Sequence, residues 1–190
     1  MTRKTLRFSL LALPVALAAC GTPNISQYTI SAPMPQARVP ARVSSIEVRD
    51  VSIPRYAAAD EIAVLEPDGA IRAIKDTSWA DDPQRAVTMA LARDLGAITG
   101  ARVAAEPWPF GELPSAQLTV RVDHMLAGLD GNLRMTGQYI VAPVAVQMTD
   151  RSDRFDITIP VEEATPVAVA RAQGKAVTQL AEIIARKIAR

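Results

Sequence analysis

The sequence predicts an α+β fold: an antiparallel sheet with two amphipathic helices packed on one face. In three runs between residues 118 and 161, apolar and polar side chains alternate, which is the period of a strand with one buried face. In two other segments, each opening at a proline, apolar residues recur every three or four positions, which is the period of a helix. The order strands, helix, strands, helix favours both helices on one face of the sheet.

Composition limits the classes of function. The chain has 190 residues, 49% hydrophobic and 22% charged, enough for one packed domain. A net charge of +1 argues against a general nucleic-acid partner, because binding phosphates requires a surplus of basic residues. The single cysteine excludes an internal disulfide.

Residues 1–19 are predicted to be a secretory signal peptide. A basic start at Arg3, Lys4 and Arg7 precedes an apolar run from Phe8 to Leu17. The run is too short for a bilayer span, which needs about 20 apolar residues. Removing residues 1–19 takes away three of the 21 basic residues, so 18 basic face 20 acidic side chains. With no basic surplus, the mature chain is not expected to bind anionic lipid headgroups by charge alone.

The end of this segment resembles a bacterial lipobox. Leu17, Ala18 and Ala19 precede Cys20, whose thiol would carry diacylglycerol and whose freed amine would be acylated. Two or more acyl chains anchor a protein stably to a bilayer. Gly21 occupies the place where Asp acts as an inner-membrane retention signal in such lipoproteins, so we expect the outer membrane. The alternative is a signal peptide with an incidental cysteine.

Residues 20–41 are expected to be the lipidated N-terminus and a proline-rich tether, with the folded domain at 42–190. Four prolines in this segment favour extended backbone, with a short strand at Tyr28-Thr29-Ile30. In the domain, β-branched residues predict a strand within 43–51. Residues 62–65 and 71–74 flank Pro67-Asp68-Gly69, which predicts a hairpin.

The two helices have clear start signals. Asp82-Pro83 resembles an N-cap followed by proline at the first helical position, and Gly100 is a plausible end. The apolar stripe of this helix is Val87, Leu91, Leu95 and Ile98. Thr165-Pro166 predicts the start of the second helix. Between the helices, Asp130-Gly131-Asn132 predicts a tight turn between the first two alternating strands.

We find no motif for catalysis, a metal or a cofactor. His124, the only histidine, falls on the apolar side of its strand by parity, which favours a core histidine with one hydrogen-bond partner over a catalytic residue. Asp81-Asp82 and Glu162-Glu163 precede the predicted helices, where capping and the helix dipole explain them. The chain has neither a phosphate-binding loop nor a dinucleotide-binding fingerprint.

Two tryptophans stand out because aromatic residues make up only 4% of the chain. Trp79 and Trp108 flank the first predicted helix, and packing in the core at its two ends is the simpler interpretation. The alternative is contact with a protein or lipid partner, since tryptophan is enriched at binding hot spots.

Several short motifs together resemble one family. Ile53-Pro54-Arg55-Tyr56 is followed by Glu61-Ile62-Ala63-Val64 and then by Ser78-Trp79-Ala80. In this order after a lipobox, over roughly residues 20–190, they resemble the ABC-type transport auxiliary lipoproteins of the PqiC or YmbA type. The family pattern has Leu for Ile53 and Arg for Ser78, so this chain departs from it at both positions.

The resemblance implies a function. Such proteins are non-catalytic outer-membrane lipoproteins that face the periplasm, partner with MCE-domain proteins, and serve lipid transport or membrane integrity; a homo-oligomer is a further expectation. Tyr56, Trp79 and Trp108 become candidate partner contacts. The alternatives are a periplasmic lipid-binding carrier and an assembly or pilot lipoprotein of another envelope machine, such as a secretin. We predict no nucleic-acid partner and no cofactor.

Overall fold

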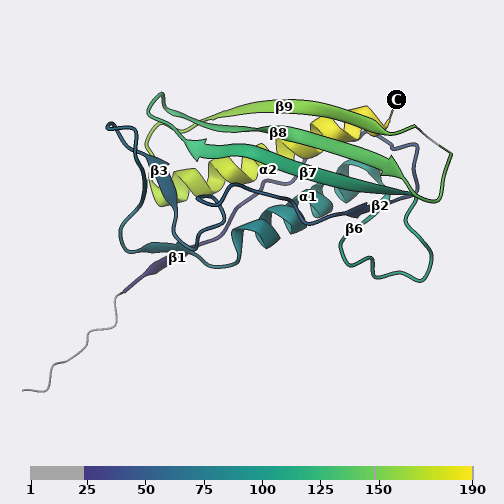
Figure 1. Ribbon diagram of the computed structural model, residues 1–190, viewed down its shortest axis with the longest axis horizontal. Coiled ribbons are helices and arrows are strands. Elements are labelled where there is room, and N and C mark those ends of the chain that lie inside the picture. Colours follow the sequence, from purple (N-terminus) through teal and green to yellow (C-terminus); the bar gives the residue numbers. More distant parts are fainter. Residues whose placement is uncertain (1–23, 148, 190) are drawn as a thin grey trace, which may run out of the picture.

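The computed structural model describes residues 24–147 and 149–189 (Figure 1). The predicted signal peptide, the lipobox and Cys20 lie outside these residues. The described chain forms, in order, β1 (Ser26–Tyr28), β2 (Ser45–Val48), β3 (Ala63–Leu65), β4 (Ile71–Ala73), β5 (Thr77–Trp79), α1 (Pro83–Thr99), β6 (Arg102–Ala105), β7 (Ala116–Ala127), β8 (Asn132–Pro143), β9 (Arg151–Pro160) and α2 (Pro166–Ile188).

The main sheet is mixed, which corrects the predicted antiparallel sheet. Strands β7, β8 and β9 form the predicted antiparallel meander, and β3 and β4 the predicted hairpin. However, β2 pairs in parallel with both β6 and β7, and β3 meets β7 in parallel at Val64 and Ala127. Parallel neighbours need a crossover connection, which α1 supplies between β2 and β6. The α+β class and the two helices on one face are confirmed (Figure 1).

Both helices begin at the residues that their start signals predict. The Asp82 carboxylate accepts a hydrogen bond from the Arg85 backbone N–H at 2.7 Å, and the Thr165 hydroxyl accepts one from Ala168 N–H at 3.3 Å. Each cap satisfies a backbone donor that the first helical turn leaves unpaired. Helix α1 ends at Gly100, whose φ of 70° is in the left-handed region.

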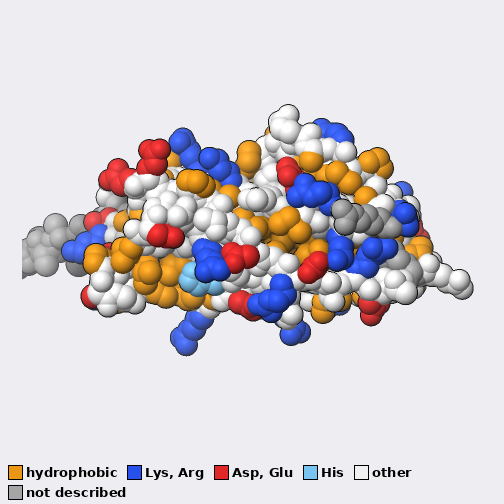
Figure 2. Space-filling model, turned by 90° about the horizontal axis from the view of Figure 1, so that it is seen from above, with side chains coloured by type: hydrophobic (Ala, Val, Ile, Leu, Met, Phe, Trp, Pro, Cys, Tyr) orange, Lys and Arg blue, Asp and Glu red, His pale blue; other side chains and the backbone are white. Residues whose placement is uncertain are grey.

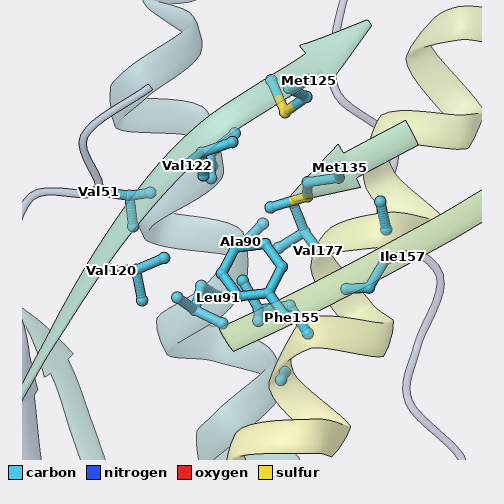
Figure 3. Packing of buried hydrophobic residues seen from close by; sticks show 14 of the residues in the cluster. Val51, Ala90, Leu91, Val120, Val122, Met125, Met135, Phe155, Ile157 and Val177 are labelled. Atoms are coloured by element: carbon cyan, nitrogen blue, oxygen red, sulfur yellow. The ribbon is translucent and has the colours of Figure 1, made fainter. Parts of the chain in front are cut away.

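The core lies between the sheet and the two helices (Figure 3). Leu91 of α1 and Val177 of α2 point toward the side chains of Val120, Met135 and Ile157 from the three long strands. All five are at most 1% exposed. Burying a side chain of this size stabilises the fold by about 1.5–3 kcal/mol, so this layer holds the helices on the sheet.

A β-bulge in β7 overturns the predicted position of His124. The pairing of β7 with β8 shifts register between Val122 and His124, so one extra residue enters the strand and the alternation reverses. Met125 is therefore buried in the core, whereas His124 is partly exposed. The prediction assumed an unbroken two-residue period, which the bulge interrupts.

Residues 26–41, which we call the N-terminal strap, pack on the domain. Strand β1 pairs in parallel with β5, and the Val39 backbone N–H donates to the Ile98 carbonyl at 2.9 Å. Tyr28, Ile30 and Val39 pack against the core. The predicted tether through residue 41 is thus too long, because from Ser26 onward the chain contacts the helices and β5.

Candidate binding groove and loop surface

The first candidate site is a groove between the strap and α1. It has a volume of about 430 Å³ and is open along one side. Tyr28 and Ile30 of the strap form one wall, and Trp79, in register with Tyr28, closes one end. Trp79 is only 7% exposed, so the predicted core packing of this tryptophan agrees with the structure. The groove gives Trp79 one surface that a ligand can reach.

The floor of the groove is a second stripe along α1. Ala86, Met89, Ala90 and Arg93 follow one another at helical spacing on a face beside the buried core stripe. Met89 is 49% exposed, so this stripe is partly open to solvent. The sequence reasoning identified only the core stripe, although the apolar residues at 86, 89 and 90 were a visible signal for a wider one.

The wall formed by the strap is held by α2. At Gly174, an added Cβ would lie 2.1 Å from the Ser31 carbonyl oxygen, so the strap crosses α2 at a notch that only glycine allows. One turn later, the Thr178 hydroxyl donates to Asp94 Oδ2 at 2.7 Å and lies 3.3 Å from the Pro33 carbonyl oxygen. The groove wall therefore packs on α2 over one helical turn.

A buried charge accompanies this attachment. The Asp94 side chain is fully buried, and its Oδ1 accepts hydrogen bonds from Nε and one Nη of Arg93 at 2.8 and 2.7 Å. Pairing with a guanidinium offsets the cost of burying the carboxylate. Arg93 thus links the buried polar cluster to the rim of the groove, where half of its side chain is exposed.

The second candidate site is a set of exposed hydrophobic side chains on two neighbouring loops, which we call the loop surface. Its residues are Phe110 and Leu113 from the β6–β7 loop and Val144 and Val146 from the β8–β9 loop, and Leu113 is 70% exposed. The loops are joined because the Val144 backbone N–H donates to the Ser115 carbonyl at 2.9 Å. Such a patch is a candidate for protein contact.

Trp108 supports the loop surface and is not in the core. Its ring is partly exposed and meets Phe110 edge-on, with ring centroids 4.8 Å apart. The indole Nε1 donates to the Glu112 carbonyl at 2.7 Å, and the Arg102 guanidinium lies 4.9 Å from the Phe110 ring centroid. The predicted core packing of Trp108 is therefore wrong, because the β6–β7 loop carries the residue away from α1.

Tyr56 connects its own turn to strand β7. Its hydroxyl accepts a hydrogen bond from the Met125 backbone N–H at 3.1 Å and lies 3.2 Å from His124 Nδ1. These contacts connect the turn around residue 56 to the bulge of β7. The structure does not bring Tyr56, Trp79 and Trp108 together: each belongs to a different part of the surface.

The groove, the loop surface and the fold can now be compared with known proteins. The family model described as the ABC-type transport auxiliary lipoprotein component matches residues 28–185. The chain belongs to this family. The predicted resemblance is confirmed at this level. No curated protein sequence matches the auxiliary lipoprotein.

Two solved structures share the fold of the auxiliary lipoprotein. The crystal structure of an uncharacterized protein has a TM-score of 0.70 at 17% identity, covering 87% of this chain and 99% of that one. Protein XCC0632 from Xanthomonas campestris has a TM-score of 0.67 at 16% identity, covering 86% and 95%. At these identities the likeness concerns the fold alone.

Several exposed charged side chains of the auxiliary lipoprotein form ion pairs. Figure 2 shows basic and acidic side chains interleaved on one face, with the histidine at the surface. A hydrogen bond from Lys187 lowers the pKa of Asp153 below 3.8, and one from Arg134 does the same for Asp156. These exposed pairs cross-link β8, β9 and α2 and need no ligand.

The paired carboxylates have structural positions. Asp82 caps α1, Asp81 pairs with Arg85, and Glu162 and Glu163 are exposed ahead of α2. Across residues 24–147 and 149–189, no three histidine, cysteine or acidic side chains are grouped as metal ligands. Within the same residues, neither helix combines the length and apolar character that crossing a bilayer requires.

Proposed function

We propose that this auxiliary lipoprotein is a non-catalytic outer-membrane subunit of an ABC/MCE-type intermembrane lipid transport system. Acyl chains on Cys20 hold it to the outer membrane, and the domain faces the periplasm. There it binds the envelope-spanning MCE component and so supports membrane integrity.

The observation that carries the proposal is the separation of β1 from the loop surface. In Figure 1, β1 lies at the lower left of the long axis and the two loops lie at the right. Cys20 precedes Ser26 by six residues, which span at most about 22 Å when extended. An anchor at Cys20 therefore keeps the β1 end near the membrane and leaves the loop surface for a partner that approaches from the periplasm.

The chemistry of the loop surface supports a protein partner. Besides its exposed aliphatic side chains it has an aromatic pair, Trp108 and Phe110, with Arg102 over the Phe110 ring. Tryptophan and arginine dominate the energetics of many interfaces, and a polar rim around an apolar centre is typical of them. Arg102 also pairs with Glu112, which supplies such a rim.

A lipid carrier is the second candidate, because the groove is apolar. A carrier must enclose its cargo, and small-molecule sites usually bury about 70–90% or more of the ligand's surface. The groove is open along one side and has room for part of a lipid only. We therefore favour a docking subunit over a free carrier.

Recovery of partners from crosslinked envelopes tests the proposal. Wild-type protein and Leu129→Glu, which alters another exposed leucine outside the loop surface, are expected to recover an MCE-domain protein. Leu113→Glu is expected to lower recovery about tenfold, the effect of roughly 1.4 kcal/mol at an interface centre. All three proteins should be equally abundant in the outer membrane.

Two results would contradict this role. Recovery of no MCE protein by the wild type would refute docking, and recovery of a secretin subunit in its place would favour a pilot lipoprotein. Equal recovery by Leu113→Glu and Leu129→Glu would show that the partner binds elsewhere.

A further inference from the structure

We infer that the groove between the strap and α1 binds one acyl chain of a membrane phospholipid. The inference deepens the proposed function and rests on its membrane anchorage, because the anchor is what brings the groove to the bilayer. It assigns a lipid contact to the domain itself, separate from the covalent anchor at Cys20.

The dimensions of the groove suit a single chain. Its volume of about 430 Å³ is at the small end of the roughly 300–1,000 Å³ typical of ligand sites. The α1 residues that line it, from Ala86 to Arg93, extend over about 10 Å at 1.5 Å per residue. One leaflet contributes about half of a hydrocarbon core that is about 30 Å thick. The groove therefore accommodates about two thirds of the length of one acyl chain.

The lining suits a hydrocarbon. Tyr28, Ile30, Trp79 and Ala86 present apolar surface, Met89 lies along the floor, and the one acidic residue of the lining, Asp81, pairs with Arg85. Methionine is flexible and polarizable, so it adapts to chains of different shape. A chain in the groove would cover the exposed half of Met89, and each buried CH₂ contributes about 0.8 kcal/mol. The strap wall packs closely on α2 at Gly174, so the groove exists before a ligand arrives.

The rim supplies a cation for a phosphate. Two of the guanidinium nitrogens of Arg93 donate to Asp94, and the third nitrogen has no hydrogen-bond partner among the described residues. Guanidinium N–H groups bind phosphate oxygens well. Because Asp94 also orients the guanidinium, little side-chain freedom is lost when a headgroup binds.

The distance to the anchor identifies the occupant as a membrane lipid. Tyr28, in the groove wall, follows Cys20 by eight residues, which extend to at most about 29 Å. A site tethered so close to a bilayer meets acyl chains at a high effective concentration. Other occupants are a second copy of the chain, a partner helix, or an acyl chain of the protein's own anchor. The experiment below distinguishes a phospholipid chain from these other occupants.

The two tryptophans provide the assay. Trp79 lines the groove and Trp108 belongs to the loop surface, so Trp108→Phe leaves one reporter at the site and Trp79→Phe leaves one away from it. Lipidated protein is reconstituted in vesicles of phosphatidylethanolamine and phosphatidylglycerol with brominated acyl chains, which quench tryptophan on contact. Trp79 is expected to lose most of its fluorescence, and Trp108 to keep it. The anchor's own chains carry no bromine and cannot quench.

Substitution of the groove floor supplies the matched control. Met89→Glu, made in the Trp108→Phe background, places a carboxylate among the apolar side chains and is expected to abolish quenching of Trp79. Leu129→Glu in the same background replaces an exposed apolar residue elsewhere and should leave quenching unchanged. Both variants should sediment with the vesicles.

Failures of the inference and of the anchorage give different results. Sedimentation with vesicles but no quenching of Trp79 overturns the inference and leaves the anchorage intact, as does equal quenching of both tryptophans. If Met89→Glu forms a smaller oligomer than the unsubstituted protein and quenching does not change, the inference is also overturned, because the groove is then a protein interface. If the protein does not sediment, the anchorage fails, and a brominated fatty acid in solution tests the groove directly: quenching of Trp79 upholds an acyl site, and its absence overturns it.

Discussion

The same substitution in the two helices is expected to change stability in opposite directions. Gly96 is in α1 and Gly174 is in α2, and replacing a helical glycine by alanine ordinarily stabilises by about 0.8–1 kcal/mol. At Gly96 an added Cβ would come no closer than 3.7 Å to Val103, an ordinary contact. Gly96→Ala should therefore raise the free energy of unfolding by up to about 1 kcal/mol.

At Gly174 the added methyl group has no room. It would lie 2.1 Å from the Ser31 carbonyl oxygen and 2.5 Å from the Ala32 nitrogen, against a normal contact of about 3.5–4 Å. The strap must move, and overpacking of this kind costs about 1–3 kcal/mol. After subtracting the helix gain, Gly174→Ala should lower stability by up to about 2 kcal/mol.

Urea unfolding of the chain carrying Cys20→Ser measures both variants. Amide exchange at Val39, which donates to Ile98 at 2.9 Å, reports the strap separately and should accelerate only in Gly174→Ala. If Gly174→Ala is as stable as Gly96→Ala and Val39 stays protected, the strap does not pack on α2 as described, and the groove loses its wall.

Three further substitutions test other parts of the structure. Asp82→Ala should lower stability by about 1 kcal/mol while Asp82→Asn stays near wild type in urea unfolding, because either cap oxygen can accept the helix N–H; equal losses would contradict the capping role. Tyr56→Phe should cost about 1–3 kcal/mol, since the Met125 N–H loses its acceptor, and should leave partner recovery unchanged; the reverse pattern would restore Tyr56 as a partner contact. Burial, with the Asp153 carboxylate adding to it, raises the pKa of Tyr139 above 10.0. The neutral phenol therefore stabilises the fold below pH 10.0, and this contribution is lost as pH rises through the raised pKa. Tyr139→Phe should move the alkaline unfolding midpoint to higher pH, and an unchanged midpoint would refute the linkage.

Much of the fold could be predicted because its signals are local. Asp82-Pro83 and Thr165-Pro166 open the helices, and Gly100 and Gly131 have the positive φ that a helix end and a tight turn require. These residues act within a few positions of themselves, so no knowledge of the rest of the chain is needed.

The features that could not be predicted from the sequence depend on contacts between residues far apart in the chain. Residues 45–48 pair in parallel with residues about 70 positions later, and nothing in either run specifies that neighbour. The bulge before His124 reverses burial without any glycine or proline in β7 to announce it. Gly174, an isolated glycine in a helical pattern, was a sign of close backbone approach, but the segment that approaches lies more than 140 residues earlier. The groove follows from that contact, so it could not be predicted before the strap was placed.

The proposed role requires that acylation of Cys20 holds one end of this domain at the outer membrane. Density-gradient fractionation of envelopes from cells that make the wild type or Cys20→Ser, with mass determination of the mature N-terminal peptide, tests this requirement. We expect an acylated peptide and outer-membrane sedimentation for the wild type, and release of Cys20→Ser into the periplasm with a weakened permeability barrier. Sedimentation of Cys20→Ser with the outer membrane, with the barrier intact, would contradict it.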